Sequence, residues 1–474
     1  MRWSDFPMWG RRVADWALSY HQTLRSRPVR PNIIPGSIRD ALPKDAPEQA
    51  DSIEAIMQDF ERLVVPGLTH WQHPRFFAYF PANAAPASVL AEYLVSTIAP
   101  QCMLWQTSPA ATEMETRMLD WLRGAIGLPD AFSGVIQDSA SSATLAAVLT
   151  MRERALGWTG NSQGLTDKPA LRVYCSSEVH TSIDRAIWIA GIGSENLVRI
   201  PIVGPGRAMD PQALEAAIRA DQQAGRIPIG VIASTGGTSV GGSDDIGAVC
   251  KIAKAFDLYV HVDAAWAGSA MICPEYRSLW TGVEDADSVV FNPHKWLGAQ
   301  FDCAAHFLKN PESLVQTLAI QPEFLKTHGA DGIINYSEWS VPLGRRFRAL
   351  KIWFLLRAYG LEGLRTMIRN HVTWTHEIAE RFRERRDFEI VTEPVLALFS
   401  FRHVPSDIED VDAYNLRLVN ALNEDGRIYL TQTRVDGKVA IRFTVGAFST
   451  EQEDVQTAYD VIVEIAESLA RSTE

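Results

Sequence analysis

The chain contains two informative stretches, Phe291-Asn292-Pro293-His294-Lys295-Trp296 and, upstream of it, His261-Val262-Asp263-Ala264-Ala265. Each stretch includes or directly follows a run of apolar residues that favour β-structure. In a parallel sheet, the carboxyl ends of neighbouring strands open into the crevice where such folds bind ligands. We therefore expect the side chains of Lys295 and Asp263 to face one crevice.

A lysine amine and a carboxylate in one crevice suit pyridoxal phosphate. This cofactor needs a lysine for its aldehyde and an acid facing its pyridine nitrogen. At about 3 Å and an effective dielectric constant of about 20, a carboxylate attracts the protonated nitrogen by roughly 5 kcal/mol before desolvation is subtracted. The protonated ring would then accept electrons. The pair predicts Lys295 as the covalent attachment point and Asp263 as the partner of the ring nitrogen.

The middle of the chain alternates between short apolar runs and helical patterns, which predicts an α/β fold. A mostly parallel sheet covered by helices on both faces accounts for this alternation. The predicted strands are Leu171 to Cys175, Leu197 to Val203, Ile229 to Ala233, Leu258 to Val262 and Ser288 to Phe291.

Three further strand-to-helix junctions carry candidate ligand groups. The serine run at Ser139 to Ser142 precedes a helical pattern and suits a phosphate at a helix start, although an ordinary helix cap explains it equally well. His180 is either structural or stacked on a cofactor ring. The glycine-rich turn Ser234 to Gly242 allows close backbone approach but fits no nucleotide-binding motif.

The flanking regions predict two smaller parts around the sheet domain. Residues 1–80 form a helical arm, which we expect to pack on another subunit or on the main body. Residues 81–345 form the large domain, and residues 346–474 form a small α+β domain whose long helix breaks near Gly360. The segment from Ile320 to Ser340 carries Tyr336 and reads as a long loop.

Composition excludes several other classes. The chain has 474 residues and a formal net charge of −12, so nothing favours nucleic acid or an anionic membrane as a partner. Its five cysteines form no paired motif and predict a cytoplasmic protein with reduced thiols. No signal peptide or membrane span is predicted. Metal-ligand spacing around His261 and a G-x-S-x-G nucleophile are both absent from the sequence.

Four long stretches together resemble the aromatic L-amino-acid decarboxylases of the group II pyridoxal phosphate decarboxylases. The likeness runs from the arm to the last domain, with the motifs in the same order. The stretches are His73-Pro74-Arg75-Phe76-Phe77-Ala78-Tyr79-Phe80-Pro81, His261 to Gly268, Asn292 to Trp296, and Pro342-Leu343-Gly344-Arg345-Arg346-Phe347-Arg348.

The resemblance implies a fold-type I architecture with a seven-stranded sheet, and a homodimer whose active sites lie at the subunit interface. It implies that Lys295 forms the Schiff base, Asp263 pairs with the ring nitrogen, and His180 stacks above the ring. Tyr336 would be the proton-donating tyrosine of a mobile loop, contributed across the dimer. The remaining cofactor residues would be Ser139, Ala140, Ser141, Thr235, Ala265, Asn292 and His294, and the substrate pocket would contain Trp71, Tyr79, Phe80, Pro81, Ala82 and Met103.

The implied activity is decarboxylation of tryptophan, tyrosine, DOPA or phenylalanine to the arylalkylamine. Ala82, Asp138 and Met103 depart from the animal DOPA decarboxylases, which leaves the preferred ring open. Two alternatives share the fold: an aromatic acetaldehyde synthase, against which the joint presence of His180 and Tyr336 argues, and an aminotransferase or carbon-sulfur lyase.

Overall fold

The computed structural model describes residues 1–320 and 333–471. It divides the chain into two compact units: Met1–Pro81 together with Thr373–Glu474, and Ala82–Val372. The sequence predicted boundaries at 80/81 and 345/346. Leu350, in the first turn of helix α12 (Ala349–Arg383), packs with Ala91 and Val95 inside the second unit.

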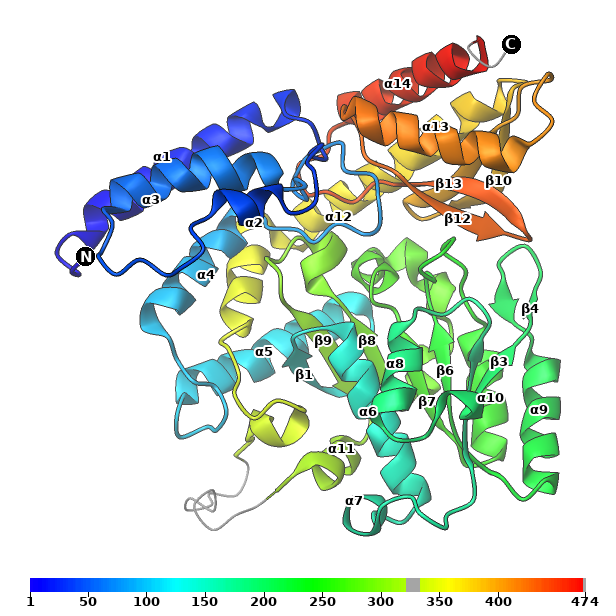
Figure 1. Cartoon of the computed structure of the whole chain (residues 1–474). Coiled ribbons are helices and arrows are strands. Elements are labelled where there is room, and N and C mark those ends of the chain that lie inside the picture. The colour runs from blue at the N-terminus through cyan, green and yellow to red at the C-terminus, as the bar shows by residue number, and fades with distance from the viewer. Residues whose placement is uncertain (321–332, 472–474) are drawn as a thin grey trace. The chain divides into compact units, whose positions relative to one another are not determined.

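The second unit is built on a seven-stranded sheet (Figure 1). Strand β9 runs antiparallel to both of its neighbours, and the other adjacent pairs are parallel. This confirms the prediction of a mostly parallel sheet. In spatial order the strands are β1 (Ser133–Gln137), β9 (Ala304–Leu308), β8 (Ser288–Phe291), β7 (Tyr259–Asp263), β6 (Ile227–Ser234), β2 (Leu171–Ser176) and β3 (Leu197–Ile200).

Every residue of β7, β8 and β9 is buried, which requires cover on both faces of the sheet. Helix α9 (Pro211–Gln223), which packs on this sheet, begins at a cap that its sequence provides. Asp210 accepts hydrogen bonds from the amides of Gln212 and Ala213, with Pro211 at the first helical position. The helices of this unit include α4 (Pro86–Ile98), α5 (Pro109–Ile126), α6 (Ala140–Ala155), α8 (Ser182–Ile189), α9 (Pro211–Gln223), α10 (Ile246–Ala255) and α11 (Pro311–Leu318).

The first unit combines the N-terminal arm with a four-stranded antiparallel sheet. The arm packs on the C-terminal part of the same chain, since the amide of Val29 donates to the carbonyl of Gly426 at 2.8 Å and Arg25 pairs with Asp454 at 3.0 Å. The elements are α1 (Phe6–Thr23), α2 (Ser37–Ala41), α3 (Ile53–Asp59), β10 (Phe388–Val395), β11 (Leu398–His403), α13 (Val411–Asp425), β12 (Thr431–Val435), β13 (Lys438–Thr444) and α14 (Gln452–Arg471).

In the C-terminal region the predicted break of the long helix near Gly360 is confirmed, and a hairpin turn lies at Asp436-Gly437. Helix α12 breaks at Gly360, whose φ of 64° is readily reached only without a Cβ atom. The turn Asp436-Gly437 joins β12 to β13, and both residues have positive φ as a two-residue hairpin of this type requires.

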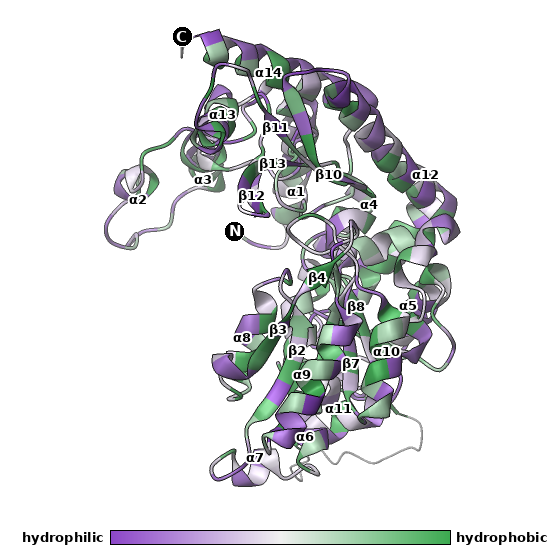
Figure 2. Ribbon diagram, turned by 90° about the vertical axis from the view of Figure 1, so that its right-hand side faces the viewer, coloured by the Kyte–Doolittle hydropathy of each residue, from purple (hydrophilic) through white to green (hydrophobic). Residues whose placement is uncertain are grey.

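Figure 2 colours the ribbon by hydropathy and shows strands β2 and β3 as mostly apolar, in agreement with a core formed by the sheet and helices α6 and α8. None of the helices in the described ranges combines the length and the hydropathy that crossing a bilayer demands.

Candidate active site

The parallel strands β6, β7 and β8 end level with one another. Asp263 pairs in register with Ser234 on one side and with Val290 on the other. Just beyond these pairs, the amide of Thr235 donates to the carbonyl of Asp263 at 3.0 Å. The amide of Asn292 donates to the carbonyl of Ala265 at 2.9 Å. The structure therefore brings Thr235, Asp263, Ala265 and Asn292 to the same edge of the sheet.

Lys295 lies in a tight turn, Pro293–Leu297, directly after β8, and its φ and ψ of −87° and −109° depart from helical values. Its backbone is held on both sides: its amide donates to the carbonyl of Asn292 at 2.9 Å, and its carbonyl accepts from Nδ2 of Asn83 at 2.7 Å. The amide of Asn83 also donates to the carbonyl of His294. The main chain around Lys295 is thus fixed, while its side chain is only half-buried.

His180 lies within electrostatic range of both predicted cofactor partners. Desolvation lowers the pKa of His180 below its usual value, the Asp263 carboxylate opposes this shift, and the Lys295 ammonium adds to it. Its Nδ1 accepts a hydrogen bond from the amide of Ser182 at 3.1 Å, which assigns the ring proton to Nε2. The imidazole is exposed, so a flat ligand has room to stack on it.

The start of helix α6 lies against the ends of β8 and β9. Ala140 and Ala143 pack with Val290 and Ala304, and Ala265 packs against this cluster. Ser139 caps the helix by accepting from the amide of Ser142 at 3.2 Å, so the helix-cap interpretation of the serine run is confirmed. The cap leaves other amides of the first turn without helical partners, so this helix start is also suited to a phosphate.

His294 is buried and held as a neutral hydrogen-bond donor. Its Nδ1 accepts from the amide of Cys303 at 2.9 Å, which leaves the proton on Nε2. Burial, reinforced by the nearby Lys295 ammonium, lowers the pKa of His294 to about 3. This imidazole therefore offers an N–H group at neutral pH without adding charge.

Two side-chain atoms of the predicted cofactor set are buried with no hydrogen-bond partner among the described residues: Oγ1 of Thr235 and Oδ1 of Asn292. Burying such an atom without a partner costs about 1–3 kcal/mol, so most native proteins supply one. A ligand with a polar ring and a phosphate offers acceptor oxygens to the Thr235 hydroxyl, and to the Asn292 amide once its oxygen and nitrogen exchange places. The residues at this edge therefore fit pyridoxal phosphate.

Four of the predicted substrate residues belong to the first unit, whereas Lys295 belongs to the second. These four are Trp71, Tyr79, Phe80 and Pro81. The Trp71 and Tyr79 rings stack with centroids 5.9 Å apart and are 40% and 48% exposed. The buried members of the aromatic stretch form core, and Trp71 and Tyr79 present a flat exposed surface. Ala82 begins the second unit, next to Asn83.

Sequence reasoning missed Arg442, which lies under this aromatic stretch. Its guanidinium stands 5.3 Å from the centroid of the Phe80 ring and donates to Oγ1 of Thr431 at 3.2 Å. Burial lowers the pKa of Arg442 to about 10. The available signal was an arginine inside the otherwise apolar strand from Val439 to Phe443.

Tyr336 is the residue that the resemblance implied as the proton donor of a mobile loop. It lies in a short 3-10 helix, Tyr336–Trp339, and is 2% exposed. Its hydroxyl is 2.9 Å from Oγ1 of Thr116, and the Arg345 guanidinium stands 5.0 Å from the centroid of its ring. These contacts fix the phenol. Residues 321–332 of the predicted loop lie outside the described residues, and their sequence contains no tyrosine.

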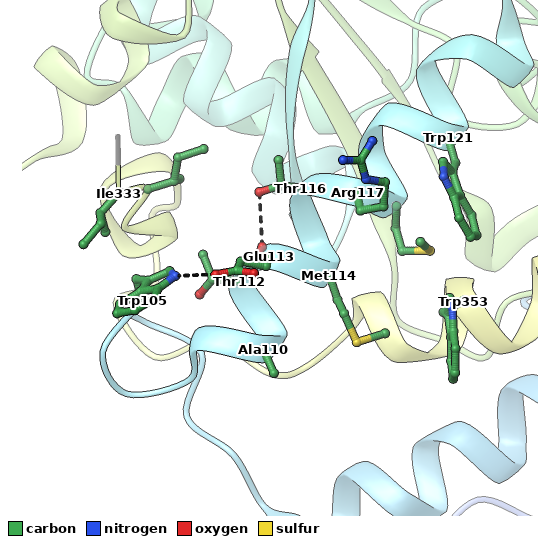
Figure 3. A pocket seen from close by; sticks show the side chains of 12 residues that line it. Trp105, Ala110, Thr112, Glu113, Met114, Thr116, Arg117, Trp121, Ile333 and Trp353 are labelled. Atoms are coloured by element: carbon green, nitrogen blue, oxygen red, sulfur yellow. Dashed lines mark hydrogen bonds between the residues drawn. The ribbon is translucent and has the colours of Figure 1, made fainter. Parts of the chain in front are cut away.

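The backbone of Met103 is fastened to the same region, because its carbonyl accepts from the amide of Ser337 at 3.0 Å. Thr116 also lines a cavity of 820 Å³ whose lining shares no residue with the predicted cofactor set (Figure 3). Its wall includes the indole rings of Trp105, Trp121 and Trp353, and the Trp105 indole donates to Glu113 at 3.1 Å.

A lysine and an acid at neighbouring strand ends, an imidazole beside both, and a helix start for a phosphate define a fold-type I pyridoxal phosphate enzyme. The conserved domain of the pyridoxal-dependent decarboxylases matches residues 35–404, and this chain belongs to that family.

The relatives span the whole chain. It is 39% identical to the aromatic-L-amino-acid decarboxylase of Sus scrofa, over 100% of this chain and 99% of that protein. It is 38% identical to the phenylacetaldehyde synthase of Arabidopsis thaliana, over 97% and 96%. The solved structure of Oryza sativa TDC with PLP and tryptamine superposes with a TM-score of 0.95 at 34% identity, covering 99% of each chain.

Proposed function

We propose that this protein uses pyridoxal phosphate to remove the α-carboxyl group of aromatic L-amino acids. The observation that carries the proposal is the gathering of Lys295, Asp263 and His180 at one edge of the sheet. Relatives named for decarboxylation of tryptophan, tyrosine and aromatic L-amino acids support the substrate class.

When bound, the cofactor supplies an aldehyde that captures the substrate amine and a protonated ring that accepts the electrons left when carbon dioxide departs. Lys295 provides the amine for covalent attachment. Asp263 would hold the proton at the pyridine nitrogen, and Ala265, Thr235 and His180 would contact the ring. The proton of His180 is on Nε2. The phosphate would be held by Ser139, Ala140, Ser141, Asn292 and His294.

The substrate side chain is bound by aromatic and apolar surfaces. The stacked Trp71 and Tyr79 rings and the adjacent Phe80 and Pro81 present flat apolar area. The resemblance assigns Ala82 and Met103 to the substrate as well, and binding of the aromatic ring would orient the Cα–carboxylate bond for cleavage.

Release of carbon dioxide from the aromatic amino acids tests the proposed function and ranks its substrates. Purified enzyme loaded with pyridoxal phosphate is incubated separately with tryptophan, tyrosine, DOPA and phenylalanine. We expect carbon dioxide from at least one of them and none from glutamate. Formation of a keto acid only when a second amino acid is present, without carbon dioxide, would instead identify an aminotransferase.

A second candidate function, oxidative decarboxylation and deamination to the aryl acetaldehyde, is favoured by the burial of Tyr336. The phenol is bound to Thr116, and the segment 321–332 offers no other tyrosine hydroxyl to protonate Cα. Without a proton donor at Cα, molecular oxygen would take up the electrons instead. One amino acid, one O2 and one water would then give aldehyde, carbon dioxide, ammonia and hydrogen peroxide. The molar ratio of amine to aldehyde plus peroxide separates the two candidates.

Replacing Tyr336 with phenylalanine tests the proton-donor role directly. Because the hydroxyl is occupied by Thr116, we expect Tyr336→Phe to cost about 1 kcal/mol of unfolding free energy and to leave the ratio of amine to aldehyde unchanged. Thr116→Val is the matched variant, since it removes the same hydrogen bond from the other side. A fall in amine with a matching rise in aldehyde for Tyr336→Phe alone would establish Tyr336 as the proton donor.

We also propose that the protein is a homodimer with shared active sites. Helix α4 supports this, because it exposes a contiguous set of apolar side chains, of which Leu90 and Ile98 are 61% and 65% exposed. The full set is Val89, Leu90, Tyr93, Leu94 and Ile98.

Charged substitutions on this face test the dimer. Leu90→Asp combined with Ile98→Asp should produce a monomer of about half the mass by light scattering, because burying two carboxylates disfavours association. Ser96→Asp, a polar position of the same helix, is the control and should remain dimeric. A double variant that keeps the dimer mass would exclude α4 from the interface.

The proposed location is the cytoplasm. All five cysteines are buried and unbridged, in agreement with a reducing compartment.

A further inference from the structure

Lys351 is a buried lysine that the proposed chemistry does not use. It lies in the first turn of α12 and is 1% exposed. Its Nζ donates to the carbonyl oxygens of Gln300 and Asp302, both at 3.1 Å, and to Oε1 of Gln300 at 2.9 Å. Oε2 of Glu92 on α4 lies 2.9 Å away. The ammonium therefore ties the turn at residues 300–303 to two helices.

This turn holds one of the predicted phosphate residues. Cys303 follows directly after Asp302, and its amide donates to Nδ1 of His294 at 2.9 Å, while its carbonyl accepts from the His294 amide at 3.2 Å. Arg348 fixes the turn further, since its Nε donates to Oδ1 of Asp302 at 2.8 Å. Movement of the turn would release the bond that keeps the His294 proton on Nε2.

We propose that Lys351 is a positioning residue for the cofactor's phosphate: it fixes the turn at 300–303, which orients His294, and it places a positive charge behind that imidazole. This inference rests on the proposed role of His294 as a phosphate donor. A chain with a net charge of −12 must attract an anionic phosphate by local positive charge, and Lys351 provides such a charge.

The charge around Lys351 is mixed, so its protonation state matters. Glu92 and Asp302 contribute carboxylates, Arg346 and Arg348 contribute guanidinium groups, and the neutral imidazole of His294 and the thiol of Cys303 complete the surroundings. Burial lowers the pKa of Lys351 to about 8. A nearby phosphate favours the protonated amine, and by linkage the protonated amine favours the phosphate.

The sign of the pH dependence follows from this coupling. Below pH 8, Lys351 is charged in the apoprotein and attracts the phosphate; as the pH rises through 8, the charge and the attraction are lost. The phosphate itself stays dianionic above its second pKa of about 6. Affinity for a phosphate-bearing ligand should therefore fall at alkaline pH, beyond any change shared with a ligand that lacks phosphate.

The experiment compares binding of pyridoxal phosphate and of pyridoxal to the apoprotein, at pH 7 and at pH 9.5, by fluorescence titration. Lys351→Met should weaken pyridoxal phosphate binding roughly tenfold at pH 7 and leave pyridoxal within about twofold. In the unsubstituted protein, the ratio of pyridoxal phosphate affinity to pyridoxal affinity should fall roughly tenfold from pH 7 to pH 9.5. In Lys351→Met this ratio should be the same at both pH values. Lys309→Met, an exposed lysine bound to the carbonyl of Glu284, is the control.

If Lys351→Met does not fold, the same titrations are made with the double variant Lys351→Met and Glu92→Gln, which removes both charges of the ion pair. Unchanged pyridoxal phosphate affinity, or an equal loss for both ligands, would overturn the inference. His294→Ala separates this result from the proposed function. If His294→Ala weakens pyridoxal phosphate and Lys351→Met does not, only the role of Lys351 fails; if His294→Ala has no effect, the phosphate assignment of His294 fails as well.

Discussion

Lys295→Ala is expected to lower carbon dioxide release by at least about 10³-fold, because the variant cannot attach the cofactor covalently or return it after each turnover. The yellow absorbance of the enzyme-bound cofactor should shift to that of free pyridoxal phosphate, and borohydride should no longer fix it to the protein. The fold should persist, since the Lys295 backbone is held by Asn292 and Asn83 and its side chain is half-buried.

Lys309→Ala is the matched control for this substitution. Lys309 is exposed and lies just after β9 in the same unit, so losing it should change neither absorbance nor rate. Retention of a borohydride-reducible bond in Lys295→Ala would contradict the assignment of the attachment point.

Asp263→Asn is expected to have the second largest effect. The amide removes the negative charge that keeps the pyridine nitrogen protonated, and an attraction of roughly 5 kcal/mol, reduced by desolvation, corresponds to a rate loss of roughly 10³-fold. Covalent attachment at Lys295 should survive, so the variant should remain yellow while carbon dioxide release collapses. Rate and absorbance together distinguish this effect from loss of the cofactor.

Two comparisons make the Asp263 experiment specific. Asp245→Asn changes an exposed carboxylate that caps α10 through the amide of Ala248, and it should cost at most about 2 kcal/mol of stability without affecting the rate. A cofactor methylated at the ring nitrogen carries a permanent positive charge and should restore part of the rate of Asp263→Asn. A variant with normal activity on the ordinary cofactor would remove Asp263 from the mechanism.

The edge of the sheet was predictable because short-range signals determine it. The predicted strand Ser288 to Phe291 is apolar after its first residue, and the structure gives strand β8 the same bounds. Once parallel strands are expected, residues directly after them must gather at one edge, which is where Thr235, Asp263 and Asn292 lie. The helix cap formed by Asp210 with Pro211 and the hairpin turn Asp436-Gly437 also depend only on neighbouring residues.

The unpredicted features depend on contacts between residues far apart in the chain. Tyr336 looked like a loop residue because glycine and polar residues precede it, yet Thr116, 220 positions away, holds its hydroxyl. Nothing in the sequence distinguishes Lys351 from the other cationic residues of its helix. The structure shows that its ammonium group is surrounded by oxygens of Gln300, Asp302 and Glu92. Pattern and propensity do not contain this information.

The start of the long helix shows the same dependence on packing. The sequence marks where the long helix begins, but packing decides to which unit its first half belongs. Leu350 packs in the cluster with Ala91 and Val95, and Trp353 lies against it. A helix can therefore start in one compact unit and continue in another without any local signal.

The most direct test of the central claim is to locate the cofactor on the unsubstituted enzyme. The protein is saturated with pyridoxal phosphate, reduced with borohydride, digested and analysed by peptide mass spectrometry. The proposed chemistry predicts a phosphopyridoxyl group on Lys295 and on no other lysine. A stable label on a different lysine, or the absence of any reducible adduct at saturating cofactor, would contradict it.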